Sequence, residues 1–127
     1  MTITILTLFP GLFQGFLESS ILARAIARGL VTVRLVDIRD YAADRHHVCD
    51  DAAYGGGPGM VMKPEPIAAA LEATGAPGGR IVYSTCSLEN EENQNVVQSL
   101  RLRAETHLRL PGRDPGDGFF AAVITLV

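Results

Sequence analysis

The chain has 127 residues, a formal net charge of −3, 47% hydrophobic residues and 20% charged residues. This composition is ordinary for a globular domain, and the length allows a real hydrophobic core. No apolar run approaches the roughly 20 residues that span a bilayer, and residues 1–6 lack the basic start of a signal peptide. We therefore expect a cytoplasmic protein that does not enter a membrane. The negative charge argues against a strongly basic nucleic-acid binder.

The basic residues and the cysteines narrow the expected chemistry further. Lys63 is the single lysine of the sequence, and the other ten basic residues are arginines. Five of these arginines fall in the first part of the chain. They could form a local basic face, or they could simply lie on solvent-exposed faces of helices and strands. Cys49 and Cys86 have no metal-ligand spacing and make no disulfide framework. The sequence therefore predicts no metal site.

The first elements alternate between strand and helix. Residues 1–8 are β-branched and apolar, which predicts a buried strand. Pro10 suits the first turn of a helix, and apolar residues then recur at helical spacing. A second helical piece over residues 21–26 has Ser19 and Ser20 as candidate caps at its start and Gly29 at its end. Residues 30–38 predict a second strand, parallel to the first across this helical connection.

Residues 39–62 show no apolar period, and so long a loop in a small domain is usually functional or disordered. Its charged and imidazole side chains are Arg39, Asp40, Asp44, Arg45, His46, His47, Asp50 and Asp51. A glycine segment follows, whose backbone can approach a ligand closely or form a simple flexible turn. It consists of Tyr54, Gly55, Gly56, Gly57, Pro58, Gly59 and Met60. It matches neither a P-loop nor a dinucleotide-binding fingerprint.

The remaining elements continue the alternation. A helix is expected from Pro64 or Pro66 to about Ala73, followed by a strand over residues 80–85 and a helix over residues 88–103. Residues 106–110 and 119–126 flank a turn-rich linker, which predicts an antiparallel hairpin. We expect one α/β domain over residues 1–127, with segments 1–83 and 84–127. Its fold class is a three-layer sandwich, unknotted and Rossmann-like, around a five-stranded, mostly parallel sheet.

Several motifs of residues 1–83 occur in the order and spacing of one known family. TLFPGLF, SSILARAIARGL and RDYAADRHHVCDDAAYGGGPGM resemble the amino-terminal part of the bacterial tRNA guanine-N1 methyltransferases of the trefoil-knot class. The resemblance places the glycine segment 54–60 beside the substrate and cofactor pocket. Cys49 stands where a small apolar residue is usual, so we expect a small, buried or half-buried hydrophobic side chain and not a ligand. The later segments that hold S-adenosylmethionine in that family are missing.

Cys86 directly follows an expected strand and precedes an expected helix. The helix dipole favours its thiolate, whereas Glu89, Glu91 and Glu92 oppose ionisation, so a purely structural cysteine is an open alternative. STCSLENEEN and LPGRDPGDGFFAAV, within residues 79–127, resemble the end of the RNA cytosine-C5 methyltransferases of the Sun/NOL/RsmB type. This second resemblance implies that Cys86 takes the catalytic nucleophile position. It also implies that Asp117, Gly118, Phe119 and Phe120 belong to a structural closing strand.

The two resemblances meet near Tyr83, and they guide the expected strand order 2-1-3-5-4, with the last strand antiparallel. Strand 80–85 would then be central, parallel and buried. The sequence is interpreted as a recombined or engineered chimera, a folded scaffold without catalytic turnover and with no cofactor expected. The alternatives are an S-adenosylmethionine-dependent RNA methyltransferase acting on tRNA guanine N1 or rRNA cytosine C5, and a weak cofactor- or RNA-binding module. We expect a weak RNA contact at most, and a monomer or a homodimer, with domain swapping as a further possibility.

Overall fold

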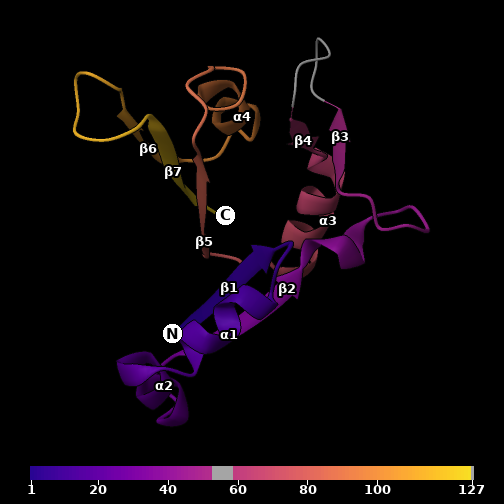
Figure 1. Cartoon of the computed structure of the whole chain (residues 1–127), viewed down its shortest axis with the longest axis vertical. Helices are drawn as coiled ribbons and strands as arrows, with labels where there is room; N and C mark the ends of the chain where they lie inside the picture. Colours follow the sequence, from indigo (N-terminus) through magenta and orange to yellow (C-terminus); the bar gives the residue numbers. More distant parts are fainter. Residues whose placement is uncertain (53–58, 127) are drawn as a thin grey trace. The chain divides into compact units, whose positions relative to one another are not determined.

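The computed structural model describes residues 1–52 and 59–126. The chain divides into two compact units, a first unit Met1–Thr74 and a second unit Gly75–Val127. Figure 1 shows the helices and strands of the two units. The single domain expected over residues 1–127 and the absence of a knot both stay predictions. No helix within the described ranges is long and apolar enough to cross a membrane.

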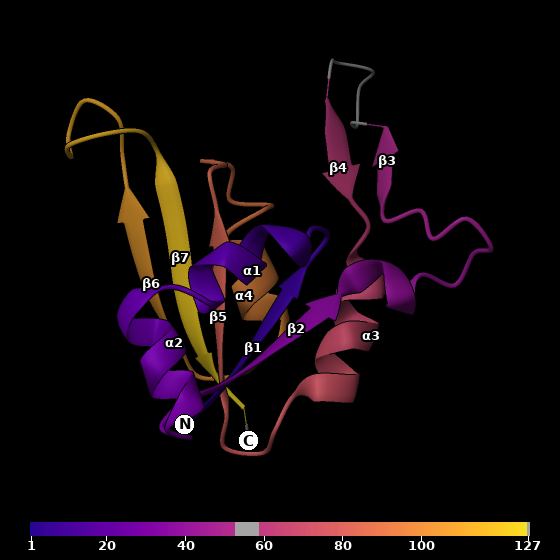
Figure 2. The ribbon, with the colours of Figure 1, turned by 60° about the horizontal axis from the view of Figure 1, so that its bottom comes forward.

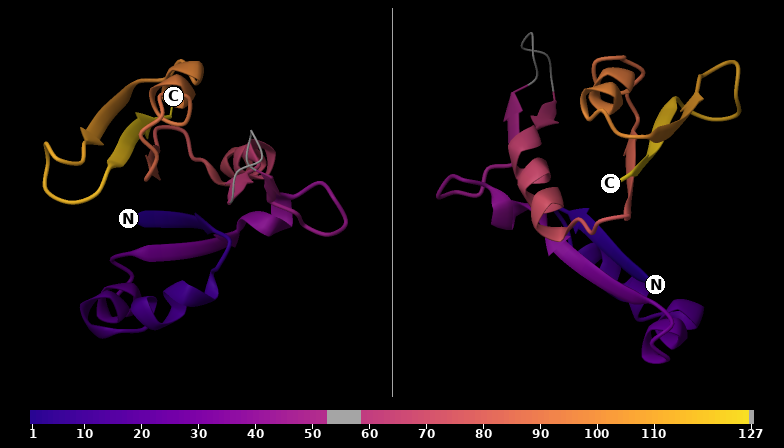
Figure 3. Two further views of the ribbon diagram at one scale, coloured as in Figure 1. Left: turned by 45° about the horizontal axis from the view of Figure 1, so that its top comes forward. Right: turned by 180° about the vertical axis from the view of Figure 1, so that it is seen from behind.

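The first unit begins with the expected strand–helix–helix–strand order. β1 (Thr2–Thr7) and β2 (Thr32–Asp37) form a parallel pair in which Thr2 lies opposite Thr32 and Thr7 opposite Asp37. α1 (Gly11–Leu17) and α2 (Ser20–Ala27) connect these strands and lie on one side of the pair (Figure 3). The predicted parallel pair is therefore confirmed.

The ends of these helices follow the sequence signals. Pro10 immediately precedes α1, where its fixed φ is compatible with a helix start. Ser19 precedes α2 in an extended conformation, but its hydroxyl donates to the carbonyl of Gly15 instead of capping the helix. Gly29 follows α2 with φ of +68°, and its N–H donates to Ile26. A left-handed residue at this place explains the glycine.

The long loop expected over residues 39–62 contains more regular structure than the sequence indicates. The 3-10 helix η1 covers Ile38–Tyr41, and β3 (Asp50–Ala52) pairs antiparallel with β4 (Met60–Met62). Strands this short leave no readable alternation of apolar and polar residues. α3 (Pro64–Thr74) follows β4, as expected, and packs against η1.

The second unit is built on a three-stranded antiparallel sheet. β7 (Phe119–Thr125) lies between β5 (Arg80–Thr85) and β6 (Ala104–Arg109), antiparallel to both (Figure 2). This arrangement confirms the last three places of the expected order and the hairpin. α4 (Gln94–Ser99) brings Val97 against Phe120, Ala122 and Ile124, which form the hydrophobic core of this unit.

Two expectations for this region are wrong. The described strands form three separate sheets, and no five-stranded Rossmann-like sheet joins β1 to β5. β5 is accordingly an edge strand, antiparallel to its neighbour, whereas a central, parallel and buried strand was expected. Its side chains alternate in burial, and Val82 is 71% exposed. An apolar strand does not distinguish between these two environments, because packing partners decide its burial.

The helix expected over residues 88–103 is also shorter than predicted. Turns occupy the residues before α4, with hydrogen bonds from the N–H of Glu92 to Glu89 and from the N–H of Asn93 to Asn90. The fully buried Asn93 side chain accepts from the Thr85 hydroxyl at 2.8 Å and donates to the Ser87 carbonyl at 2.8 Å. Asparagine competes in this way with helical hydrogen bonding. The helix therefore begins after Asn93.

Candidate functional site

A polar hollow of about 240 Å³ lies in the first unit, where the chain passes from η1 toward β3. Between these two elements runs the charged loop, residues 42–49. Leu8 and Arg39 form part of the wall, and the loop and the start of β3 supply the rest. Its remaining lining residues are His46, His47, Val48, Cys49 and Asp50. Polar and charged groups therefore dominate this site.

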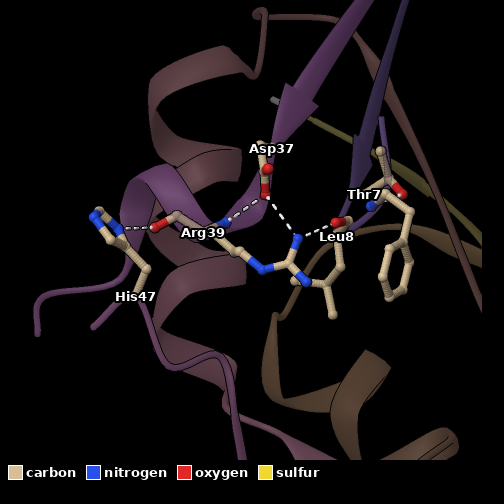
Figure 4. Close-up of polar contacts among 6 residues, drawn as sticks. Thr7, Leu8, Asp37, Arg39 and His47 are labelled. Atoms are coloured by element: carbon tan, nitrogen blue, oxygen red, sulfur yellow. Dashed lines mark hydrogen bonds and ion pairs between the residues drawn. The ribbon is translucent and has the colours of Figure 1, made fainter. Parts of the chain in front are cut away.

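Arg39 anchors the site through three contacts that we call the Arg39 clasp (Figure 4). Its guanidinium donates to the carbonyl of Leu8 and lies 3.7 Å from the Asp37 carboxylate. The same group lies 5.2 Å from the centre of the Phe9 ring, a cation–π distance. Asp37 also accepts the backbone N–H of Arg39 at 2.9 Å, which caps η1. The clasp thereby joins the ends of β1 and β2.

The charged loop is held by side chains that bond to its own backbone. The carboxylate of Asp44 accepts the N–H of His46 at 2.8 Å and that of Val48 at 3.0 Å. His47 has φ of +55°, and its Nδ1 lies 2.8 Å from the carbonyl oxygen of Arg39. Because a carbonyl oxygen accepts, Nδ1 carries the proton in this contact. The loop is thus shaped by polar contacts.

The electrostatics of Asp44 reflect the same contacts. Partial desolvation acts to raise the pKa of its carboxyl group, but the hydrogen bonds from His46 and Val48 and the charge of Lys63 outweigh it. The pKa of Asp44 is therefore lowered, and the side chain is ionised at neutral pH. A carboxylate held in this state is suited to shaping the loop, and it is a poor general base.

Cys49 is the last residue of the charged loop, and its side chain is buried. It is 4% exposed and free, so the expectation of a small buried hydrophobic residue is confirmed. Its carbonyl accepts the N–H of Lys63 at 2.8 Å, which ties the loop to the end of β4. No group of three or more His, Cys, Asp or Glu side chains in the described part of the chain is placed to hold a metal ion.

The glycine segment falls largely outside the described residues, since these include only Gly59 and Met60 of its seven positions. Asp51 pairs with Val61 and Ala52 with Met60, so the strands on either side of the segment pair with each other. The glycine pattern predicted a site at this segment, but no sequence pattern marked Arg39 or Asp44 as site residues. The sequence signal that could have indicated these two residues is the charged run before the glycines, which shows no apolar periodicity.

Cys86 lies in the second unit, directly after β5, and its side chain is exposed. Thr85 and Ser87 on either side are bonded to the buried Asn93, which fixes the turn that carries the cysteine. Cys86 belongs to the second unit, whereas the charged loop belongs to the first. The nucleophile role of Cys86 stays a prediction.

Comparison with known proteins identifies the family. The family model for tRNA (guanine-1)-methyltransferase TrmD matches residues 1–116. The chain belongs to this family. It is 44% identical to the tRNA (guanine-N(1)-)-methyltransferase of Protochlamydia amoebophila over 110 residues, covering 87% of the chain and 48% of that protein. The corresponding Chloroflexus aggregans enzyme is 58% identical over 103 residues, covering 79% of the chain and 40% of the enzyme. The chain thus spans less than half of these relatives.

A solved structure agrees with this assignment. The tRNA (m1G37) methyltransferase of Aquifex aeolicus matches with a TM-score of 0.54 and 39% identity, over 61% of this chain and 37% of that one. The family match continues to residue 116, beyond the joint expected at Tyr83. It therefore lends no support to a change of family at that residue. The fold is mixed α/β with small sheets, like that of the TrmD family.

The expectation that no cofactor is involved is wrong for a member of this family, because TrmD methyltransferases use S-adenosylmethionine. The hollow beside Arg39 does not by itself enclose this molecule. The hollow beside Arg39 measures about 240 Å³, whereas small-molecule sites commonly occupy about 300–1,000 Å³ and are mostly apolar.

Proposed function

We propose that the chain takes part in S-adenosylmethionine-dependent methylation of guanine N1 in tRNA. The observation that carries this proposal is the family match over residues 1–116. The likeness to the Aquifex enzyme supports it, because the two chains are similar in both sequence and fold. Cytoplasmic localisation is part of the same proposal.

We assign an RNA-facing side to the first unit. The charged loop and the glycine segment 54–60 adjoin each other along the chain through β3. Arg39 and the imidazole of His47 border the polar hollow, and Lys63 follows β4. Donor groups of this kind suit phosphate and base-edge acceptors. On this proposal the residues bind and orient the RNA, while Asp44 holds the loop in shape.

Methyl transfer tests the proposal directly. The purified chain is incubated with a tRNA transcript and S-adenosylmethionine carrying a labelled methyl group, and the RNA is then digested to nucleosides. We expect the label in 1-methylguanosine, and none when the target guanosine is replaced by adenosine. Absence of label from every nucleoside would contradict the proposal and would support a scaffold without turnover.

A second candidate function rests on the second unit. The order β5-β7-β6, with β7 antiparallel between its neighbours, is the one expected from the resemblance to RNA cytosine-C5 methyltransferases. Cys86 is exposed at the end of β5, where that resemblance puts the nucleophile. The same nucleoside analysis separates the two functions. Label in 5-methylcytidine that is lost on Cys86→Ser would favour this candidate, whereas 1-methylguanosine would be insensitive to that change.

The oligomeric state is a separate proposal. A monomer or a homodimer is expected, and β5 presents an unpaired edge within its own sheet. Light scattering coupled to size-exclusion chromatography measures the mass in solution. A mass of about 13.6 kDa identifies the monomer, and twice that mass identifies the dimer.

A further inference from the structure

The sheet of the second unit has two faces of different character. The core face carries Phe120, Ala122 and Ile124 of β7 and packs against α4. The opposite face, called the outer face here, carries the alternate residues of the three strands. Its middle strand contributes Phe119, which is 44% exposed, and β5 contributes Val82, which is 71% exposed. The outer face therefore presents apolar and aromatic surface to solvent.

Arginines border this apolar surface on both sides. The register pairs Arg80 of β5 with Thr125 and Arg109 of β6 with Phe119, so these side chains share the outer face. Arg103 precedes β6, and together with Arg80 it lines a polar hollow of about 250 Å³. Two arginines from opposite edges of the sheet thus converge on one hollow.

The charge of the outer face is unbalanced. Glu105 is the acidic residue among its strand positions, against Arg80, Arg103 and Arg109. The ion pair within the described part of the chain joins Arg39 to Asp37 in the first unit, so none engages these three arginines there. Arg103 and Arg109 are six residues apart, about 20 Å along an extended strand. The positive charge therefore extends along the face.

From this arrangement we propose that the outer face of the β5-β7-β6 sheet binds single-stranded RNA. Arginines would contact the phosphates from both edges, and a base would stack on the exposed ring of Phe119. Basic groups that follow the backbone, combined with an aromatic ring that stacks on bases, are the usual means of binding single strands. The choice of RNA rests on the proposed function, whereas the charge and the aromatic ring are independent of it.

Fluorescence anisotropy with a fluorescein-labelled 12-nucleotide RNA of mixed sequence tests this inference on the full chain. The variant Arg80→Gln/Arg103→Gln/Arg109→Gln should bind at least about tenfold more weakly. Its plot of log affinity against log salt should be shallower by about 2, since each phosphate contact contributes about 0.7 in single strands. Phe119→Ala should weaken binding about fivefold or more, and Phe119→Tyr should retain it because the ring remains.

A matched control removes three exposed arginines from the first unit, as Arg24→Gln/Arg28→Gln/Arg34→Gln. This control should keep the affinity of the unchanged chain within about twofold, because its three arginines do not belong to the β5-β7-β6 sheet. Both triple variants change the net charge equally, so a difference between them does not come from non-specific attraction. Equal losses in both triple variants, or no loss in either, would overturn the inference. The inference would also be overturned if the chain bound no RNA and instead self-associated through this face as its concentration rises. That result would favour a protein partner.

Failure of this inference is distinguishable from failure of the proposed function. Methyl transfer to guanosine with unchanged RNA affinity in the outer-face variants would remove the inference alone. RNA binding that depends on the outer face, without any methyl transfer, would remove the proposed function alone. Circular dichroism of every variant verifies that the sheet is retained, and Phe119→Tyr preserves a readout if Phe119→Ala unfolds.

Discussion

The second unit places a fully buried phenylalanine between its sheet and α4, together with Val97, Ala122 and Ile124. The buried residues described in the first unit are smaller or more scattered, namely Ile38, Cys49, Pro66 and Ala70. Polar contacts, such as the Arg39 clasp, hold the ends of β1 and β2 instead. The first unit, which carries the charged loop, is therefore held in part by polar contacts. These contacts keep hydrogen-bond donors such as the Arg39 guanidinium near the surface. The following substitutions test this contrast.

Phe120→Ala should have the largest effect, because it removes a ring that is 0% exposed from the core of the second unit. We expect a loss of about 3–5 kcal/mol in the free energy of unfolding, from lost burial and the cavity left behind. Urea unfolding monitored by circular dichroism measures it. Phe16→Ala in α1, where the ring is 67% exposed, should cost less than about 1 kcal/mol. Comparable losses would refute the contrast.

Asn93→Ala should destabilise the second unit by about 1–3 kcal/mol, because Ser87 and Thr85 lose a buried partner. Hydrogen exchange should accelerate at residues 85–93. Asn95→Ala, which changes an exposed asparagine of α4, serves as the control and should have little effect. Unchanged exchange around Cys86 in the Asn93 variant would show that this network does not fix the turn.

Arg39→Gln should cost about 1–2 kcal/mol, since it removes a charged hydrogen bond, a part-exposed ion pair and a cation–π contact. The loss should be accompanied by faster hydrogen exchange at the end of β1. Arg34→Gln removes an equal charge from an exposed position on β2 and should leave both quantities nearly unchanged. Equal effects of the two changes would mean that the clasp contributes nothing.

Acid should weaken the charged loop through Asp44. Its pKa is lowered in the folded chain, so its stabilising contribution is present above the unfolded value of 3.8 and is lost as pH falls through the lower folded pKa. A carboxyl titration by NMR should show a midpoint below 3.8, and Asp44→Asn should remove the corresponding acid-dependent change in the amides of His46 and Val48. A midpoint above 3.8 would contradict this account.

The sequence predicted the parts of the fold in which periodicity and turn residues agree. The parallel pair around α1 and α2 and the hairpin of β6 and β7 both followed from apolar runs bounded by proline, glycine and aspartate. The motifs of residues 1–83 also identified the family that the comparisons show. These signals are local in the sequence, so they can be read without knowledge of the tertiary packing.

Other features depended on contacts that no local pattern records. The edge position of β5 is decided by its pairing with β7 and by the absence of a second partner within its sheet. The late start of α4 is decided by Asn93, whose side chain bonds to residues before it. In the site, the partnership of Arg39 with Leu8 joins residues 31 positions apart. Long-range polar contacts of this kind require the folded structure.

The central claim is that the charged loop of the first unit faces tRNA. Hydrogen exchange followed by mass spectrometry, on the full chain with and without a tRNA transcript, tests it most directly. We predict slower exchange at residues 44–51 in the presence of tRNA, retained in the Arg80→Gln/Arg103→Gln/Arg109→Gln variant and weakened in Arg39→Gln. Unchanged exchange at residues 44–51 under saturating tRNA would contradict the claim.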